Sequence, residues 1–445
     1  MTRRKLQIAG VLVALPAVLA ACRPQEAGYE VPAPQDVVMY QINPRNFAQG
    51  PSKAGEPGVL ARIVPQLDSI KSLGTNVVWI MPVYPIGRVE SKNSPYSISD
   101  YQAVNPEFGT MEDFKELVGE VHRRGMAFIM DWVANHTAWD HGWMTFHKDW
   151  YTRDSTGAVL FPEGTDWTDV ADLDYDNPDM RKAMIKSMIY WVREAGVDGF
   201  RCDVADWVPA DFWSQCIDAL RGFSGRKILM LAEGNDPATL EAGFDMNYAW
   251  DYLDALRSVF CADSSARKLL AANEAEYAVM PAGKVKLRFT TNHDEAAKKS
   301  TVEEFGGVQG ALAAYAAAIF MNGAALVYGE QEVAWPEPIS FFRYNPVDWT
   351  AHPEVRAEYR RLIGIFKEHP DIHGGDISSC TEDDVLMFEK ASRYLVAVNV
   401  RNAERTVPLP ETWRSVRRSN LLDASQEAPS DSLTLPPYAY RLYAR

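Results

Sequence analysis

Charged side chains stand at the ends of several short apolar runs in this 445-residue sequence. Arg201 and Asp203 end the run GFRCD, Glu233 follows the run ILMLA, and Asp294 follows FTTNH. If these runs are parallel strands of one sheet, the three acids meet at one edge. Buried like charges repel one another and lose hydration at a cost of several kcal/mol. Such a cost indicates a catalytic site rather than a stabilising feature.

Two carboxylates that flank one bond are the groups with which many enzymes hydrolyse glycosidic bonds, one as an acid with a raised pKa and one as an ionised nucleophile. Because side chains alternate along a strand, Arg201 and Asp203 should share a face while Cys202 points the other way. The guanidinium should then lower the pKa of Asp203 and orient its carboxylate. A buried structural ion pair is the alternative, and the matching positions of Glu233 and Asp294 disfavour it.

The elements that would position these residues form a repeat of apolar strands and amphipathic helices over residues 37–372. Helical segments such as 179–196 and 352–369 separate most of the strands. Eight such repeats predict an α/β fold, a (β/α)8 TIM barrel whose chemistry lies at the carboxyl ends of its strands. The predicted strands are 37–43, 76–82, 127–133, 197–204, 227–234, 244–248, 286–292 and 325–331.

Two segments depart from this repeat. Residues 137–177, after the third strand, contain no clear long helix and are rich in Trp, Asp, His and Gly, so we expect an inserted subdomain B above the barrel mouth. Residues 373–445 change to short alternating runs such as YLVAVNV. These runs predict a carboxyl-terminal all-β domain, an antiparallel β-sandwich.

The first 22 residues have the pattern of a lipoprotein signal peptide: basic residues, the apolar run IAGVLVALPAVLA and the order Leu-Ala-Ala-Cys. Cys22 would be the lipid anchor, and residues 23–36 a Pro-rich tether. An ordinary cleaved secretory signal is the alternative. We therefore expect the membrane as a partner and the bacterial cell envelope as the location. Arg23 is not the aspartate associated with inner-membrane retention, so the outer membrane is favoured, on its periplasmic or cell-surface face.

Composition restricts the partners further. A net charge of −15 argues against a nucleic-acid partner, because such binding depends on cationic side chains that neutralise phosphate. The four cysteines beyond Cys22 lack the spacing of a metal site. We expect buried thiols, although an even number in an oxidising compartment leaves a disulfide open.

Four segments together resemble the signature regions of the α-amylase family of glycoside hydrolases, family 13, and the resemblance covers about residues 37–445. Within that family the chain is similar to lipoprotein amylases of bacterial starch-utilisation systems, on the evidence of segments 136–154, 164–178 and 341–349. The four signature segments are DWVANH (131–136), GFRCD (199–203), LAEG (231–234) and TNHDE (291–295).

The resemblance implies a role for each matched residue. Asp203 would be the nucleophile, Glu233 the general acid and base, and Asp294 the third acid, which grips sugar hydroxyls. The remaining matched residues would bind substrate or support the site. Arg201 would orient Asp203, and Asp131 would support the network. His136 and His293 would form hydrogen bonds with the reacting glucose, and Tyr96 would stack beneath that sugar ring. The alternative for His136 and His293 is a purely structural role, in which each ring is buried in the core with its hydrogen bonds satisfied.

The sequence also departs from the family pattern. A Lys-His pair that contacts the leaving-group side in many members is replaced here by Asp206 and Trp207. Asn135 matches a position that often binds calcium, but one neutral amide without an acidic cluster gives a hard cation little support. Calcium therefore stays an open alternative, and no organic cofactor is expected.

Tryptophans are concentrated in one region, because eight of the thirteen lie between residues 132 and 213. Sugar rings stack on aromatic faces, so Trp139, Trp143 and Trp207 are predicted sugar platforms, whereas Trp191 lies in a helical stretch and should pack in the core.

The resemblance and the acids together predict a retaining hydrolase of α-glucosidic bonds, with starch-derived α-1,4-glucans or maltooligosaccharides as substrates. A transglycosylase, or a hydrolase of cyclodextrin, pullulan or sucrose, would use the same residues. A non-catalytic starch-binding lipoprotein is disfavoured by the three acids. The sequence does not indicate an oligomeric state.

Overall fold

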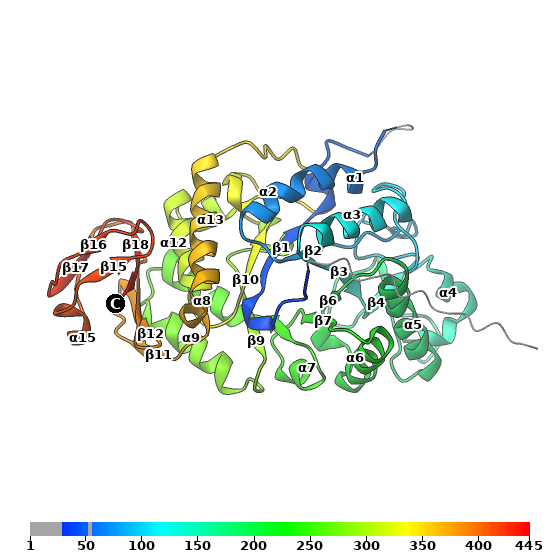
Figure 1. The fold of residues 1–445 in the computed structure, drawn as a ribbon. Coiled ribbons are helices and arrows are strands. Elements are labelled where there is room, and N and C mark those ends of the chain that lie inside the picture. Colours follow the sequence, from blue (N-terminus) through cyan, green and yellow to red (C-terminus); the bar gives the residue numbers. More distant parts are fainter. Residues whose placement is uncertain (1–28, 52–55) are drawn as a thin grey trace, which may run out of the picture.

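The computed structural model describes residues 29–51 and 56–445, and a closed barrel of parallel strands forms its centre (Figure 1). The strand order around the barrel is β1-β10-β9-β8-β7-β6-β3-β2. All eight predicted runs are barrel strands, so the predicted TIM barrel is confirmed. The strands are β1 (Val38–Ile42), β2 (Val77–Ile80), β3 (Ala127–Val133), β6 (Gly199–Asp203), β7 (Leu229–Ala232), β8 (Met246–Tyr248), β9 (Val285–Arg288) and β10 (Ala324–Tyr328).

Side chains along these strands alternate between two apolar cores. Trp79 and Ile129 belong to the core inside the barrel, whereas Phe128 and Cys202 pack outward under the helices. Near the carboxyl ends, polar residues are buried in the barrel as well, and the register places Asp131 beside Arg201. The alternation predicted around Cys202 is therefore present.

Helices cover the outside of the barrel and connect its strands (Figure 1). Local sequence fixes several helix starts: Thr110 and Asp113 form a capping box, and Asn177 caps a helix that begins with Pro178. The principal helices are α3 (Met111–Arg123), α5 (Pro178–Glu194), α6 (Ala210–Ser224), α8 (Trp250–Cys261), α9 (Arg267–Ala278), α12 (Val308–Ile319) and α13 (Pro353–Glu368). The predicted helical segments 179–196 and 352–369 correspond to α5 and α13.

The segment after β3 folds over the barrel mouth. Its strands β4 (His136–Ala138) and β5 (Val170–Asp172) pair antiparallel, and α4 (Gly142–Phe146) is short. Ser97, in the loop that follows β2, contacts this segment: the Ser97 hydroxyl donates a hydrogen bond to the carbonyl of Asp169 at 3.0 Å. This segment therefore forms one wall above the strand ends.

The carboxyl-terminal part is an antiparallel β structure that lies beside α12 and α13 (Figure 1). Its main sheet has the order β11-β12-β13-β18-β15-β16, and a separate pair, β14 (Arg405–Pro408) and β17 (Ser432–Leu435), packs on that sheet through a common apolar core. The other strands are β11 (Ile377–Ser379), β12 (Val385–Lys390), β13 (Tyr394–Asn399), β15 (Arg418–Asn420), β16 (Gln426–Glu427) and β18 (Tyr440–Ala444).

The four cysteines of the described chain are free thiols. Cys202 and Cys216 are buried and Cys380 is half-buried, but Cys261 is exposed, so the expectation of buried thiols is wrong at Cys261. Its place at the last residue of α8 explains the exposure. The predicted signal peptide and Cys22 lie outside the described residues. Among residues 29–51 and 56–445, no helix is long and apolar enough to cross a membrane.

Candidate active site

A cavity of about 430 Å³ opens at the carboxyl ends of the barrel strands. All three predicted catalytic acids and three of the predicted sugar contacts line it. These six lining residues are Asp203, Glu233, Asp294, Tyr96, His136 and His293.

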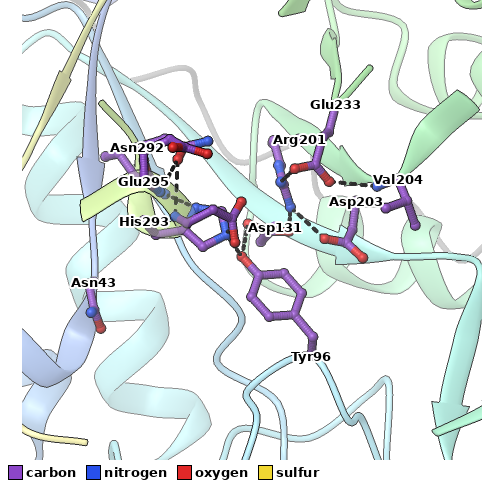
Figure 2. A network of polar contacts seen from close by, with 12 residues as sticks. Asn43, Tyr96, Asp131, Arg201, Asp203, Val204, Glu233, Asn292, His293 and Glu295 are labelled. Carbon is purple, nitrogen blue, oxygen red and sulfur yellow. Dashed lines mark hydrogen bonds and ion pairs between the residues drawn. The ribbon is translucent and has the colours of Figure 1, made fainter. Parts of the chain in front are cut away.

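The guanidinium of Arg201 lies fully buried beneath this cavity and contacts three carboxylates (Figure 2). Its Nη1 donates to Asp131 Oδ1 at 2.8 Å and to Asp203 Oδ1 at 2.9 Å. Its Nη2 lies 2.6 Å from Glu233 Oε1. Arg201 thus fixes Glu233 as well as Asp203, and the sequence had predicted only its contact with Asp203.

The turn after β6 fixes the other oxygen of Glu233 (Figure 2). The backbone N–H of Val204 donates to Glu233 Oε2 at 2.7 Å. Val204 has φ +38°, a left-handed conformation that is costly for a β-branched residue. The chain therefore holds a strained residue directly after Asp203, at the point where it binds Glu233.

Electrostatics in the site favour the retention of protons. Burial is the largest effect on each of the following groups: it raises the pKa of Asp131 to about 7 and that of Asp294 to about 6. Burial also raises the pKa of Asp203, helped by the charge of Glu233, and the opposing effect of Arg201 is smaller. Arg201 thus lowers the pKa of Asp203 as expected, but burial and the charge of Glu233 raise it by more. One buried cation cannot compensate all of these carboxylates, so the group as a whole holds protons near neutral pH.

His293 belongs to a hydrogen-bonded chain across the cavity floor. Gln41 Nε2 lies 2.8 Å from His293 Nδ1, and His293 Nε2 lies 2.7 Å from the Tyr96 hydroxyl, which donates to Asp131 Oδ2 at 3.3 Å (Figure 2). Burial lowers the pKa of His293 to about 3, so the ring is neutral. With the Gln41 amide as donor, the ring proton resides on Nε2 and points to Tyr96.

The side chain of Asn292 fixes the backbone at Asp294. The Oδ1 atom of Asn292 accepts the N–H groups of Asp294 and Glu295, each at 3.0 Å, and so caps the short helix α10 (His293–Ala296). The Asp294 carboxylate is 36% exposed and lies 3.3 Å from His293 Nε2. It is therefore fixed in position while still accessible from the cavity.

The structure places the other predicted residues at different depths. His136 lines the cavity, and burial lowers its pKa to about 4. Trp207 is 52% exposed and stacks at 5.2 Å on Trp167, which lines the cavity. The lining residues include neither Trp139 nor Trp143: Trp139 donates to the carbonyl of Thr168, and Trp143 packs on Trp150.

Asn135 does not form a recognisable calcium site. Its Nδ2 atom lies 3.4 Å from both His136 Nδ1 and Asp172 Oδ1. Calcium takes six to eight oxygen ligands, and the described part of the chain has no group of three or more His, Cys, Asp or Glu side chains that could hold a metal ion. We therefore derive no step from calcium.

Several cavity residues had no role in the sequence analysis. They are Lys92, Ser94, Asp166, Trp167, Asp169, Val170, Val204, Phe341 and Phe342. All stand outside the four signature segments, although Val204 directly follows one of them. The only available signal was that six of them lie in segments 164–178 and 341–349, which were noted for their resemblance: Asp166, Trp167, Asp169, Val170, Phe341 and Phe342.

Comparison with known proteins defines the class. Residues 41–161 and 164–219 match the family model described as alpha amylase, catalytic domain. A probable oligo-1,6-glucosidase 2 of Bacillus subtilis is 34% identical over 202 residues, which cover 38% of this chain and 34% of that relative. The chain thus matches about a third of the length of such curated relatives. A cyclomaltodextrinase of Geobacillus thermopakistaniensis is 23% identical and aligns with 92% of the chain and 77% of its own length.

Solved structures agree in fold. A maltogenic α-amylase from Thermotoga neapolitana superposes with a TM-score of 0.82 at 26% identity, over 92% of this chain and 99% of that one. An α-amylase from Lactobacillus plantarum has a TM-score of 0.80 at 27% identity over the same shares. Residues 41–161 and 164–219 therefore match the catalytic domain of the α-amylase family, and the chain shares the fold of solved α-amylases over 92% of its length. The narrower similarity to starch-utilisation lipoproteins stays a prediction.

Proposed function

We propose that this protein hydrolyses α-glucosidic bonds with retention of configuration. The observation that carries the proposal is the contact of one buried guanidinium, that of Arg201, with both Asp203 and Glu233 at the cavity. Retaining glycosidases hold their two carboxyl groups about 5–5.5 Å apart, and inverting ones about 6.5–9.5 Å apart. Two carboxylates bound by one guanidinium fit the shorter spacing.

In the first step, a carboxylate oxygen of Asp203 attacks the anomeric carbon. Glu233 gives its proton to the glycosidic oxygen, and the bond from carbon to that oxygen breaks. A covalent β-glucosyl ester on Asp203 results. In the second step, ionised Glu233 takes a proton from water, whose oxygen bonds to the anomeric carbon as the ester bond breaks. The product has the α configuration of the substrate.

This mechanism needs Glu233 protonated while Asp203 is ionised. In the free protein, Arg201 and the N–H of Val204 each contact one oxygen of Glu233, and burial raises the pKa of Asp203. The reaction therefore requires that a proton held in the site reside on Glu233 rather than on Asp203. A glycosidic oxygen near Glu233 favours that state by accepting a hydrogen bond from the protonated acid.

The remaining residues would bind the reacting sugar. Neutral His293 and His136 can exchange hydrogen bonds with hydroxyl groups, and Asp294 accepts from two neighbouring hydroxyls as charge develops on the ring. The Tyr96 ring is held by its hydroxyl contacts to His293 and Asp131, as a stacking surface requires. Trp207 extends the aromatic surface that Trp167 presents to the cavity.

We propose starch-derived α-1,4-glucans and maltooligosaccharides as substrates. Relatives are named for action on α-1,6-linked and cyclic substrates, so isomaltose and cyclodextrins are the specific alternatives. Transglycosylation would use the same intermediate. Lipid attachment at Cys22, in the cell envelope, suits a glucan that must be shortened before import. A dependence on calcium also stays a proposal to be tested with chelator.

The proposal is tested by measuring reducing ends released from maltoheptaose, isomaltose, γ-cyclodextrin, pullulan and sucrose. Wild type and the Asp203→Asn variant are compared at equal concentration. We expect turnover of maltoheptaose that falls by at least about 10³-fold in the variant. Turnover that survives the substitution would reject Asp203 as nucleophile, and turnover of isomaltose alone would reject the α-1,4 assignment.

A further inference from the structure

One side of the cavity is bordered by loops from four neighbouring strands, β10, β1, β2 and β3. The loop after β10 contributes Phe341 and Phe342 to the lining, and the loop after β2 contributes Lys92. The segment after β3 contributes Asp166 and Asp169. Whether this side is open depends on how the loops contact one another.

Lys92 and Asn93 join these loops across the rim. The Nζ atom of Lys92 donates to the carbonyl of Asp166 at 2.9 Å and lies 3.7 Å from Asp169 Oδ1. The next residue, Asn93, donates from Nδ2 to the carbonyl of Phe342 at 2.9 Å. Two consecutive residues thus connect the segment after β3 to the loop after β10.

Arg45, in the loop after β1, supports this connection from below. Its buried guanidinium donates to the carbonyl of Phe341 at 2.8 Å and to the carbonyl of Asn93 at 3.3 Å. Glu107 holds the same guanidinium through two hydrogen bonds of 2.9 Å. Charge-assisted, two-point pairs of this kind fix geometry well. The four loops therefore form one continuous wall, defined here by Arg45, Lys92, Asn93, Phe341 and Phe342.

The position of the wall relative to the acid determines which part of a substrate meets it. Glu233 protonates the leaving group, so the leaving group lies on the side of Glu233 and Val204. Phe341 lies on the other side, with ring centroids 5.5 Å from His293 and 5.9 Å from Tyr96. Figure 2 shows His293 and Tyr96 across the site from Glu233 and Val204. The wall therefore stands on the side of the sugar that forms the covalent intermediate.

We propose that this wall closes the glycone end of the cavity, so that the protein acts on the free non-reducing ends of short α-glucans. The inference rests on the proposed function, because the roles of Glu233 and Asp203 set the direction of the substrate. Internal bonds of a polymer are excluded, since their chain would have to continue through the wall. Cyclic glucans are excluded for the same reason, because they have no free end.

The test uses p-nitrophenyl α-maltoheptaoside in two forms, one with a free non-reducing end and one blocked there by a 4,6-O-ethylidene group. Turnover of both is followed with the full-length protein by chromatography of all products. We expect the free form to be shortened from its non-reducing end by a constant number of glucose units. The blocked form should react at least about 100-fold more slowly. Equal rates on the two forms, or early products of many lengths, would overturn the closed end.

A binding measurement separates this inference from the proposed function. Calorimetry with the Asp203→Asn variant compares the affinity for the same two heptaosides. Binding of the free form at least about 100-fold tighter than the blocked form supports the wall, even if wild type turns over neither, in which case only the hydrolytic function fails. Equal affinity, or no binding of either form, overturns the closed end.

A matched pair of variants assigns the effect to the wall. Phe342 is 40% exposed at the rim, and Phe342→Ala should open the wall and raise the ratio of blocked to free turnover by at least about 10-fold. Phe223 is 50% exposed on α6, away from the lining. Phe223→Ala should leave that ratio as in wild type. A ratio that stays unchanged in Phe342→Ala as well would contradict the role given to Phe342.

Discussion

Arg201 contacts Asp203 and Glu233 at the same time, at 2.9 Å and 2.6 Å. The two acids belong to the ends of different strands, and one side chain therefore fixes their relative position. Asp131 Oδ1 lies 2.8 Å from the same guanidinium, so the cation is shared by three carboxylates rather than paired with Asp203 alone.

The first prediction concerns this shared cation. Arg201→Lys keeps the charge, but a single ammonium cannot replace a planar fork that reaches two acids. We expect kcat to fall by about 10²–10³-fold, the cost of one lost donor in a catalytic site. Arg201→Ala should also lower stability by about 3–5 kcal/mol, because it leaves buried carboxylates unpaired. Wild-type kcat in Arg201→Lys would contradict the positioning role.

The second prediction separates the roles of the two acids. Glu233→Ala acting on α-glucosyl fluoride, which needs no acid to leave, should form the covalent intermediate and then stall. Added azide should restore turnover and give α-glucosyl azide, because azide does not need a general base. Asp203→Ala is the matched control and should form no α-glucosyl azide. The same azide product from both variants would contradict the assignments.

The third prediction links stability to pH through Asp294. Its pKa is raised to about 6 in the folded protein, against about 3.9 unfolded. Between these values the folded state holds the proton and unfolding releases it, so stability falls as pH rises through this window. Asp294→Asn should therefore raise Tm at pH 7.5 by about 1–2 °C, a small shift because the partly exposed carboxylate is screened.

At pH 4 the gain from Asp294→Asn should vanish, since the wild-type carboxyl is then protonated in the folded state. Thermal unfolding at both pH values checks this difference. Asp218→Asn, at an exposed position of α6, controls for the loss of one charge. A gain of equal size at pH 4 would contradict burial as its cause.

The fourth prediction concerns Glu330, which follows β10. It is 1% exposed and has φ +149°, and among the described residues neither of its carboxylate oxygens has a hydrogen-bond partner. Burial and the charge of Glu332 raise its pKa, so ionisation destabilises the fold as pH rises. Glu330→Gly removes both the backbone strain and the carboxyl and should stabilise the protein by about 1 kcal/mol.

The gain from Glu330→Gly should be larger at alkaline pH. Glu330→Ala removes the carboxyl but keeps a Cβ at the unfavourable φ, so it should stabilise less. Urea unfolding of the three proteins measures the comparison. A destabilised glycine variant would mean that the packing of the Glu330 side chain outweighs its strain.

The sequence was most informative where a strand ends. The alternation of Arg201, Cys202 and Asp203 and the apolar strand runs were sufficient to place the acids at one barrel mouth, because period and polarity are local properties. The shared contact of Arg201 with Glu233 needs the distance between two strands, which alternation within one strand does not contain. The pKa of Asp203 depends in the same way on the burial of the assembled site.

The wall of the cavity could not be predicted from local sequence patterns. Lys92, Asn93 and Phe342 lie in loops without periodicity, and their contacts join segments up to 249 residues apart in sequence. Arg45 stands next to a strand that was predicted, but its partner Glu107 is 62 residues away. Trp139 and Trp143 show the reverse case, since their residue type suggested sugar platforms and their packing keeps them out of the lining.

The most direct test of the central claim is proton NMR of the anomeric signals during the first minutes of maltoheptaose hydrolysis. Retention through a covalent intermediate on Asp203 predicts early accumulation of α-anomeric products that later equilibrate with the β form, and no such signal with Asp203→Asn. Early β-anomeric products would contradict the account, because they require direct attack by water. Turnover of similar rate by Asp203→Asn would contradict it as well.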